Sequence, residues 1–392
     1  MAQIRIAEAD YTGGVTESST ETGIVIRIPG ASFPKDMDTG MGSDTEFNIV
    51  LVTGDNYQNI ITTGGVSGTV EASLISKLYS VGAKVYIVKS WVAAKDYLTD
   101  RNQLDIKFLL CNEKDANDKN NDASSSDAGF ALENALEIAK ERRDCAVIYG
   151  KSGSTYDTAE GKAENCLTLT LPKYSDDMEE TGTAGKYVIP VYANSLKSGD
   201  ASINPEYAWI TAYLYSIAKG NAEWLAVAGA SRGESSMTLS CGPITESKII
   251  EMQPSDKGRA INPIINSNPW GVRIWGARTA EAIDSTTGIK GSHFANIRVL
   301  LCDIKKRLYA ASKKYQFEQN NDVLWVQYQS YVNTLLDEMQ STYGIAGYKW
   351  TKITDNVPGN KLKCKLEITP VEPVDDFDIN IKLTDEISTV SE

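Results

Sequence analysis

The order of hydrophobic and polar residues predicts short strands and helices in alternation over the first 260 residues. Apolar runs predict buried strands at residues 23–29, 47–54, 83–88, 106–111, 145–150, 187–192 and 224–229. Helical periodicity predicts helices at 69–81, 130–143 and 207–218. Strands that alternate with helices indicate an α/β layer.

After about residue 262 the pattern changes to two long amphipathic helices, at 294–315 and 323–343. The apolar stripe of the first contains Ile297, Leu300, Leu301, Ile304, Leu308 and Ala311, and that of the second contains Leu324, Val332, Leu335, Leu336 and Met339. Alternating segments follow at 348–353 and 361–369, and the second reads as a half-exposed strand of an antiparallel hairpin.

Both ends of the chain carry an alternating strand with nothing adjacent to pair with. The apolar positions are Ile4 and Ile6 at one end and Ile379, Ile381 and Leu383 at the other. A lone strand has to pair with something, in the same chain or in another one. We therefore expect residues 1–22 and 370–392 to be arms.

Composition excludes several classes of protein. The 392 residues are 42% hydrophobic and carry a net charge of -13, so the chain as a whole attracts neither nucleic acid nor anionic membrane. Six dispersed cysteines without a CxxC pair indicate free thiols in a reducing compartment. No apolar run has the length of a signal-peptide core or of a membrane-spanning helix. The sequence contains a single histidine, and we expect no bound metal or cofactor.

One enzymatic alternative rests on residues 229–233, which match GxSxG with Ser231 at the centre. Asp256 or Asp284 and then His293 follow in the order of an α/β-hydrolase triad. Residues 234–243 lack the helical stripe that a nucleophile elbow requires. His293 precedes a long helix, where an imidazole with a structural role is common.

Two other polar segments favour simple interpretations. The glycine-rich residues 64–69 lack the lysine of a phosphate-binding loop and read as a turn that caps a helix. The carboxylates at 176–180 have no apolar surroundings and read as a solvated loop.

The charges are distributed unevenly along the chain. Residues 294–317 hold one acidic residue, Asp303, and six basic ones: Arg298, Lys305, Lys306, Arg307, Lys313 and Lys314. The last 22 residues hold seven acidic residues and one lysine. This separation fits docking between copies or onto an acidic partner, although a solvated helix face is an equal alternative.

The C-terminal third resembles the contractile tail sheath proteins of phages, R-type bacteriocins and related injection systems. Three segments carry the resemblance: WGART at 275–279, FEQN at 317–320 between the two helices, and a closing PxxP at 370–373. The matching positions are Trp275, Gly276, Arg278, Thr279, Arg298, Phe317, Asn320, Pro370 and Pro373.

The resemblance implies an α/β (α+β) subunit without enzymatic activity, made of an N-terminal arm (1–22), an outer domain (23–262), an inner tube-proximal domain (263–369) and a C-terminal arm (370–392). Such subunits assemble in the bacterial cytoplasm as stacked hexameric rings around an inner tube, with baseplate and tail terminator proteins as further partners. Their arms add strands to neighbouring subunits, and contraction drives the tube through a cell envelope.

Tube contact has to be releasable, which favours screened charges over a large apolar patch. We therefore expect Lys305, Lys306, Arg307, Lys313 and Lys314 to face an acidic tube. The alternatives are a hydrolase built on Ser231 and His293 and a non-contractile, capsid-type structural protein.

Overall fold

The computed structural model describes residues 22–28, 31, 33, 40–42, 47–54, 56–62, 70–80, 82–112, 131–152, 184–199, 201–354 and 357–374. The predicted arm strands at Ile4, Ile6, Ile379, Ile381 and Leu383 lie outside these residues. So do the glycine-rich segment 64–69 and the carboxylates at 176–180.

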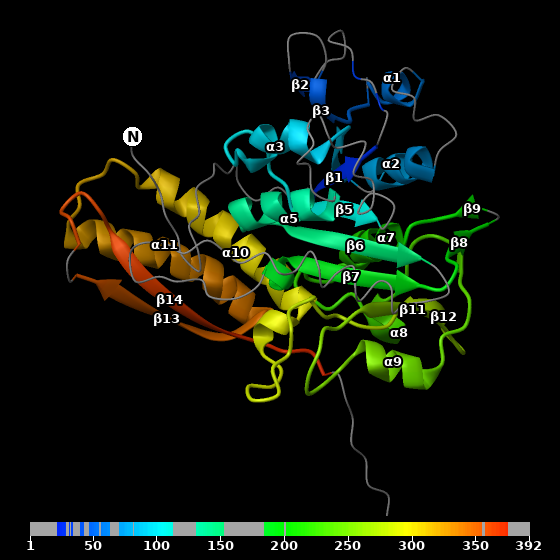
Figure 1. The fold of residues 1–392 in the computed structure, drawn as a ribbon. Helices are drawn as coiled ribbons and strands as arrows, with labels where there is room; N and C mark the ends of the chain where they lie inside the picture. The colour runs from blue at the N-terminus through cyan, green and yellow to red at the C-terminus, as the bar shows by residue number, and fades with distance from the viewer. Residues whose placement is uncertain are drawn as a thin grey trace, which may run out of the picture.

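Nine strands of the described chain form one twisted sheet in the order β12-β11-β7-β6-β5-β1-β4-β3-β2 (Figure 1). Their bounds are β1 Gly23–Arg27, β2 Gly40–Gly42, β3 Phe47–Leu51, β4 Lys84–Val88, β5 Phe108–Asn112, β6 Ala146–Ser152, β7 Val188–Ala193, β11 Asn262–Ser267 and β12 Gly271–Ile274. The six strands from β4 to β11 are parallel, and the strands at both edges are antiparallel. The parallel centre is buried on both faces, which explains its continuous apolar runs.

Helices cover both faces of this sheet. Leu74 of α2 (Val70–Ser80) and Ile210 of α7 (Pro205–Ala218) pack with Ile24 on one face. Leu98 of α3 (Trp91–Thr99) and Leu136 of α5 (Ala131–Arg142) share a second core on the other face. The shorter elements are α1 Tyr57–Thr62, η1 Ala184–Tyr187, β8 Lys197–Ser198, β9 Ala201–Ser202, α8 Gly229–Arg232, β10 Leu239–Ser240, α9 Glu246–Met252 and η2 Gly291–His293.

A second lobe lies beside the sheet and consists of α10 (Ala295–Lys314), α11 (Asp322–Ser341), β13 (Ile345–Ile353) and β14 (Lys363–Pro370) (Figure 1). The two helices pack on each other and on one face of the antiparallel β13–β14 pair. Ala295 and Val299, at the start of α10, belong to the core of the large sheet. Leu300 and Leu308, further along the same helix, belong to the core of the second lobe.

Most predicted strands and helices are confirmed, but the strand predicted at 224–229 is wrong. That segment is irregular and leads from α7 into α8. Trp224, Ala226 and Val227 are nevertheless buried there. Val227 enters the core of the large sheet, and Trp224 enters that of the second lobe. A run of buried apolar residues therefore need not have a strand partner.

β11 and β12 continue the large sheet across the predicted boundary at 262/263. β11 pairs in parallel with β7, with Asn262 opposite Val191, and β12 pairs with β11. The change in packing comes later, along α10. The division into an outer and an inner domain stays a prediction.

Candidate functional site

Lys305 and Lys306 of α10 contact the α/β layer. Lys305 is buried, and its Nζ donates a hydrogen bond of 3.2 Å to the carbonyl oxygen of Arg143, just after α5. Lys306 forms an ion pair with Asp105, in the segment before β5. Both charges join the second lobe to the sheet.

The other three predicted tube-facing residues also have partners within the chain. Arg307 pairs with Asp303 at 3.0 Å and with Glu338 of α11 at 3.4 Å. Lys313 donates to the side chain of Asn102. Lys314 lies 4.6 Å from the ring centre of Tyr331. The structure therefore spreads the five residues over contacts inside the subunit, with Lys305 in the interior, and tube contact through them stays a prediction.

A partly buried charged cluster that the sequence pattern did not reveal joins the residue before β5, α7 with the segment after it, and α10. Lys107 is buried, forms an ion pair with Glu223 and lies 5.5 Å from the ring centre of Tyr213. Burial lowers the pKa of Lys107, but the facing Tyr213, Glu223 and Asp303 outweigh burial and hold the pKa above its ordinary value. No residue-type pattern marks such a cluster, because its members are up to 196 positions apart in the chain.

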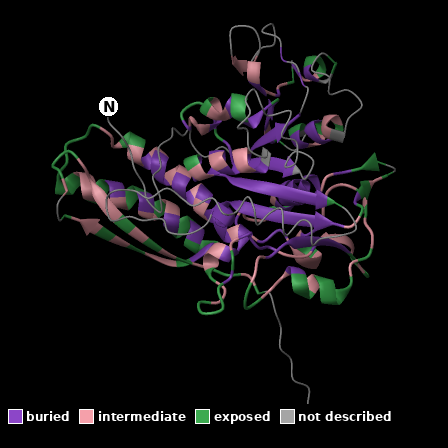
Figure 2. Cartoon of the chain, viewed as in Figure 1, coloured by how far each residue is buried: buried purple, intermediate pink, exposed green. Residues whose placement is uncertain are grey.

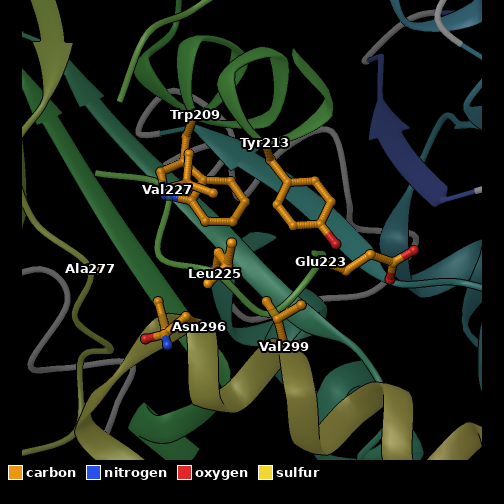
Figure 3. Close-up of a pocket in the computed structure, with 9 residues that line it drawn as sticks. Trp209, Tyr213, Glu223, Leu225, Val227, Ala277, Asn296 and Val299 are labelled. Carbon is orange, nitrogen blue, oxygen red and sulfur yellow. The ribbon is translucent and has the colours of Figure 1, made fainter. Parts of the chain in front are cut away.

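The space beside this cluster is too small for a ligand. Figure 3 shows Trp209 and Tyr213 of α7 pointing toward Asn296 and Val299 of α10 across it. Its volume is ≈ 10 Å³, room for about one water molecule. The space is part of the packing between the two lobes.

The WGART segment of the sheath-like motif lies beside the residues that lead into α10. The backbones of Arg278 and Phe294 form an antiparallel bridge, and the Arg278 guanidinium lies 4.5 Å from the Phe294 ring centre. The Thr279 amide donates to the His293 carbonyl at 2.7 Å. Arg298, one turn further, is fully buried, with its guanidinium 4.7 Å from the Tyr187 ring centre. These residues hold α10 against the large sheet.

Gly276 allows this segment to approach β11 closely. A Cβ at Gly276 would lie 2.6 Å from Gln253 Nε2 and 2.8 Å from Asn262 Oδ1. The side-chain Nδ2 of Asn262 in turn donates to the backbone carbonyls of Pro190 and Arg278, at 2.8 Å each. Trp275 also links this segment to β11, since its backbone amide donates to the carbonyl of Pro263.

The remaining motif residues lie at the far tip and at the end of the hairpin. Asn320 donates to the carbonyls of Gly359 and Lys361 at 2.8 and 3.1 Å, which ties the loop between α10 and α11 to the loop between β13 and β14. Phe317 is 89% exposed beside it. Pro370 ends β14, and Pro373 follows in an irregular segment.

The candidate triad of a hydrolase does not form. His293 Nδ1 accepts from the Lys290 amide at 2.7 Å, so the proton is on Nε2, which donates to the Ala282 carbonyl at 3.2 Å. Neither ring nitrogen is left to accept the proton of Ser231. His293 is buried and has a structural role, as its position before a helix predicted.

Metal ligands and membrane-spanning helices were searched for among the described residues as well. No group of three or more His, Cys, Asp or Glu side chains there could hold a metal ion. Within the same ranges, no helix is long and apolar enough to cross a membrane.

The β13–β14 pair offers the most distinctive surface. One of its faces packs on the helices through Trp350, Leu366 and Ile368, while Lys349 and Lys365 are exposed on the other. Half-buried and exposed residues alternate along β14 (Figure 2). Within the described chain no third strand borders either edge of this pair. Unpaired N–H and C=O groups along such edges are a template for an added strand. We identify these two edges as the candidate functional site.

Solved structures of contractile machines share this fold. A chain of the sheath complex of the extracellular contractile injection system PVC, in its contracted state, aligns over 99% of this chain and 98% of its own length, with a TM-score of 0.62 and 17% identity. A chain of the contracted anti-feeding prophage baseplate aligns over 98% and 99%, with a TM-score of 0.64 and 14% identity. The sheath tail protein of Listeria innocua aligns over 91% and 96%, with a TM-score of 0.51 and 8% identity.

No protein-family model and no curated protein sequence matches the chain. The structural alignments nevertheless extend over nearly the whole chain and over nearly the whole length of each neighbour. The described part of the chain therefore has the fold of these sheath proteins.

Proposed function

We propose that this protein is the structural subunit of a contractile sheath. It polymerises as stacked hexameric rings around an inner tube and contracts to drive the tube through a target cell envelope. The observation that carries the proposal is the full-length similarity to a chain of a contracted sheath complex, which covers 99% of this chain and 98% of that one. A partial match would have supported a shared domain only.

The open β13–β14 pair supports assembly by strand exchange. In the proposed sheath, the terminal arms around Ile4 and Ile6 and around Ile379, Ile381 and Leu383 add strands to the β13–β14 pair of neighbouring subunits. Main-chain hydrogen bonds of this kind survive a rotation of the subunits about flexible joints. The lattice therefore stays connected while it shortens.

The proposed subunit acts without catalysis or a cofactor. Energy is stored when the sheath assembles in an extended state around the tube, and repacking of the subunits releases it. Its partners are other copies of the chain, the inner tube protein, and baseplate and terminator proteins, and assembly takes place in the bacterial cytoplasm. The proposed outer domain is residues 23–262 and the proposed inner domain is residues 263–369, with β11 and β12 extending the sheet of the outer domain across this boundary.

Electron microscopy of the purified chain tests the proposal directly. We expect spontaneous polymerisation into striated tubes of constant diameter. A chain that stays monomeric in light scattering at high concentration would contradict the proposal, and closed shells would favour a capsid-type protein. Ester hydrolysis that disappears in Ser231→Ala would instead establish the hydrolase alternative.

A further inference from the structure

A recess lies at the edge of the large sheet, beside β12 (Figure 1). Its volume of ≈ 320 Å³ is in the range of small-molecule sites. Three segments line it: Tyr215 of α7, residues 234–239 after α8, and residues 270–273 at the turn into β12. None of these residues belongs to the β13–β14 pair.

The wall formed by residues 234–239 is fixed to the rest of the domain. The Ser235 hydroxyl lies 2.6 Å from the hydroxyl of Thr211 in α7. Lys77 Nζ of α2 donates to the Ser236 carbonyl at 2.7 Å. A ligand would therefore meet a wall that is already in place, which lowers the entropic cost of binding.

Trp270 offers an aromatic surface at this recess. It lies in the turn between β11 and β12 and is 48% exposed. The other aromatic residue, Tyr215, already has the Lys219 ammonium 4.1 Å from its ring centre. Within the described ranges, Trp270 has no such ring contact. The electron-rich face of its indole is available to C–H groups of a ligand.

The charged groups of the recess are committed to one another. Glu234 Oε2 lies 3.4 Å from Lys219 Nζ and 3.8 Å from Arg273 Nη2. Arg273 Nε and Nη1 donate to the carbonyls of Ala230 and Val272, at 3.2 and 2.9 Å. A phosphate would have to displace these contacts of Arg273, and an ammonium ligand would meet a carboxylate that two cations already neutralise.

Neutral hydrogen-bonding groups remain for a ligand. Both ion pairs of Glu234 use Oε2, so Oε1 is left to accept a hydrogen bond. The hydroxyls of Ser236 and Thr238 line the same recess and have no hydrogen-bond partner within the described part of the chain. A ligand that suits this site has an apolar, flat face and several uncharged hydroxyl groups.

We propose that this recess binds one or two pyranose rings of a carbohydrate. An apolar ring face stacks on Trp270, and ring hydroxyls form hydrogen bonds with Glu234, Ser236 and Thr238. Sugars of the β-gluco configuration fit best, because their ring substituents are all equatorial and axial C–H groups cover both faces. The inference goes beyond the sheath function and does not depend on it.

An added peptide strand fits this edge less well. β12 has four residues, Gly271–Ile274. The Ile274 amide already donates to the Gly233 carbonyl at 2.9 Å, and the Val272 carbonyl already accepts from Arg273. The edge therefore has few backbone groups left for main-chain hydrogen bonds.

Saturation-transfer NMR on the full-length chain tests the proposal, with methyl β-D-glucopyranoside and cellobiose as probes. We expect transfer to both sugars. The axial protons of one ring face should receive about twofold more saturation than those of the other, because only one face contacts the indole. Mannitol, which has similar hydroxyls but no ring face, should give no transfer.

Substitutions in the recess locate the binding. Trp270→Ala should abolish transfer to both sugars, and Trp270→Phe should retain part of it. Thr238→Ala should raise the dissociation constant roughly three- to tenfold, as expected for one lost hydrogen bond. Phe317→Ala is the matched control, since it removes an exposed aromatic ring outside the recess and should leave binding unchanged. Circular dichroism checks that each variant is folded.

Three results would overturn the inference. The first is no transfer to either sugar from the wild type, and the second is equal transfer from folded Trp270→Ala. The third is displacement of the sugar by inorganic phosphate or choline at equal concentration, which would assign the recess to an ion. Polymerisation tests the sheath function separately, so either proposal can fail while the other stands.

Discussion

Lys305 in α10 and Arg143 after α5 are 162 positions apart, yet Lys305 Nζ donates to the Arg143 carbonyl at 3.2 Å. The Arg143 backbone has a φ of 60°, the left-handed conformation that ends many helices. The lysine therefore caps the carboxyl end of one helix from another, and it joins the second lobe to the large sheet.

We expect Lys305→Ala to destabilise the subunit. The substitution leaves a buried carbonyl without its charged donor, which costs about 1–3 kcal/mol of unfolding free energy. Urea denaturation followed by circular dichroism measures the loss. Lys314→Ala is the matched control, since Lys314 is exposed at the end of the same helix and its removal should cost under about 0.5 kcal/mol. Equal stability of the two variants would contradict a capping role.

Gly276→Ala should also be destabilising. The new Cβ would lie 2.6 Å from Gln253 Nε2 and 2.8 Å from Asn262 Oδ1, so the backbone or Asn262 has to move. We expect a loss of about 1–3 kcal/mol. Gly347→Ala on β13 is the control, because no atom lies within 4 Å of the added Cβ and we expect a change near zero.

The ion pair between Asp105 and Lys306 should make stability depend on pH. Burial raises the pKa of Asp105, but Lys306 outweighs burial and holds the pKa below its ordinary value. A carboxyl with a lowered pKa contributes stability above its unfolded pKa of 3.8 and loses it as the pH falls through the folded value.

We therefore expect Asp105→Asn to be less stable than the wild type at pH 7 and to approach it near pH 3 or below. Denaturation midpoints at a series of pH values measure the difference. Asp105→Asn in a Lys306→Met background should have a smaller effect at pH 7. A difference from wild type that is constant across the series would exclude the ion pair as its cause.

His293→Phe tests whether the single histidine is structural. The substitution leaves the Lys290 amide and the Ala282 carbonyl without their partners, at a cost of about 2–4 kcal/mol. We expect a lower midpoint of thermal unfolding. We expect no change in ester hydrolysis, because we expect the wild type to have no such activity. A stable variant that has lost an esterase activity would instead support the hydrolase.

The sequence predicted elements well where local periodicity decides them. The stripe from Ile297 to Ala311 predicted α10 to within a residue or two, and the alternation through Leu366 predicted β14. It failed at 224–229, where burial by α10 and the large sheet takes the place of strand pairing.

The site was only partly predictable for a related reason. Charge counting identified the lysines of α10, but not that Lys305 is buried or that Lys306 meets Asp105. The partners of these two lysines lie 162 and 201 positions earlier in the chain. The alternating hairpin strand was predicted, and the sheath-like motifs predicted the fold. Whether the outer edges of β13 and β14 are paired depends on contacts with other chains. Hydrophobic periodicity within one sequence does not predict such contacts.

The division of α10 between two cores has a mechanical consequence. Ala295 and Val299 are fixed in the large sheet, while Leu300, Ile304 and Leu308 are fixed in the second lobe, with no loop between them. A pull on the β13–β14 pair therefore passes along the axis of a continuous helix into the parallel strands. The subunit is therefore rigid along the axis of α10. The flexibility of an assembly then lies in the segments that connect one copy to the next.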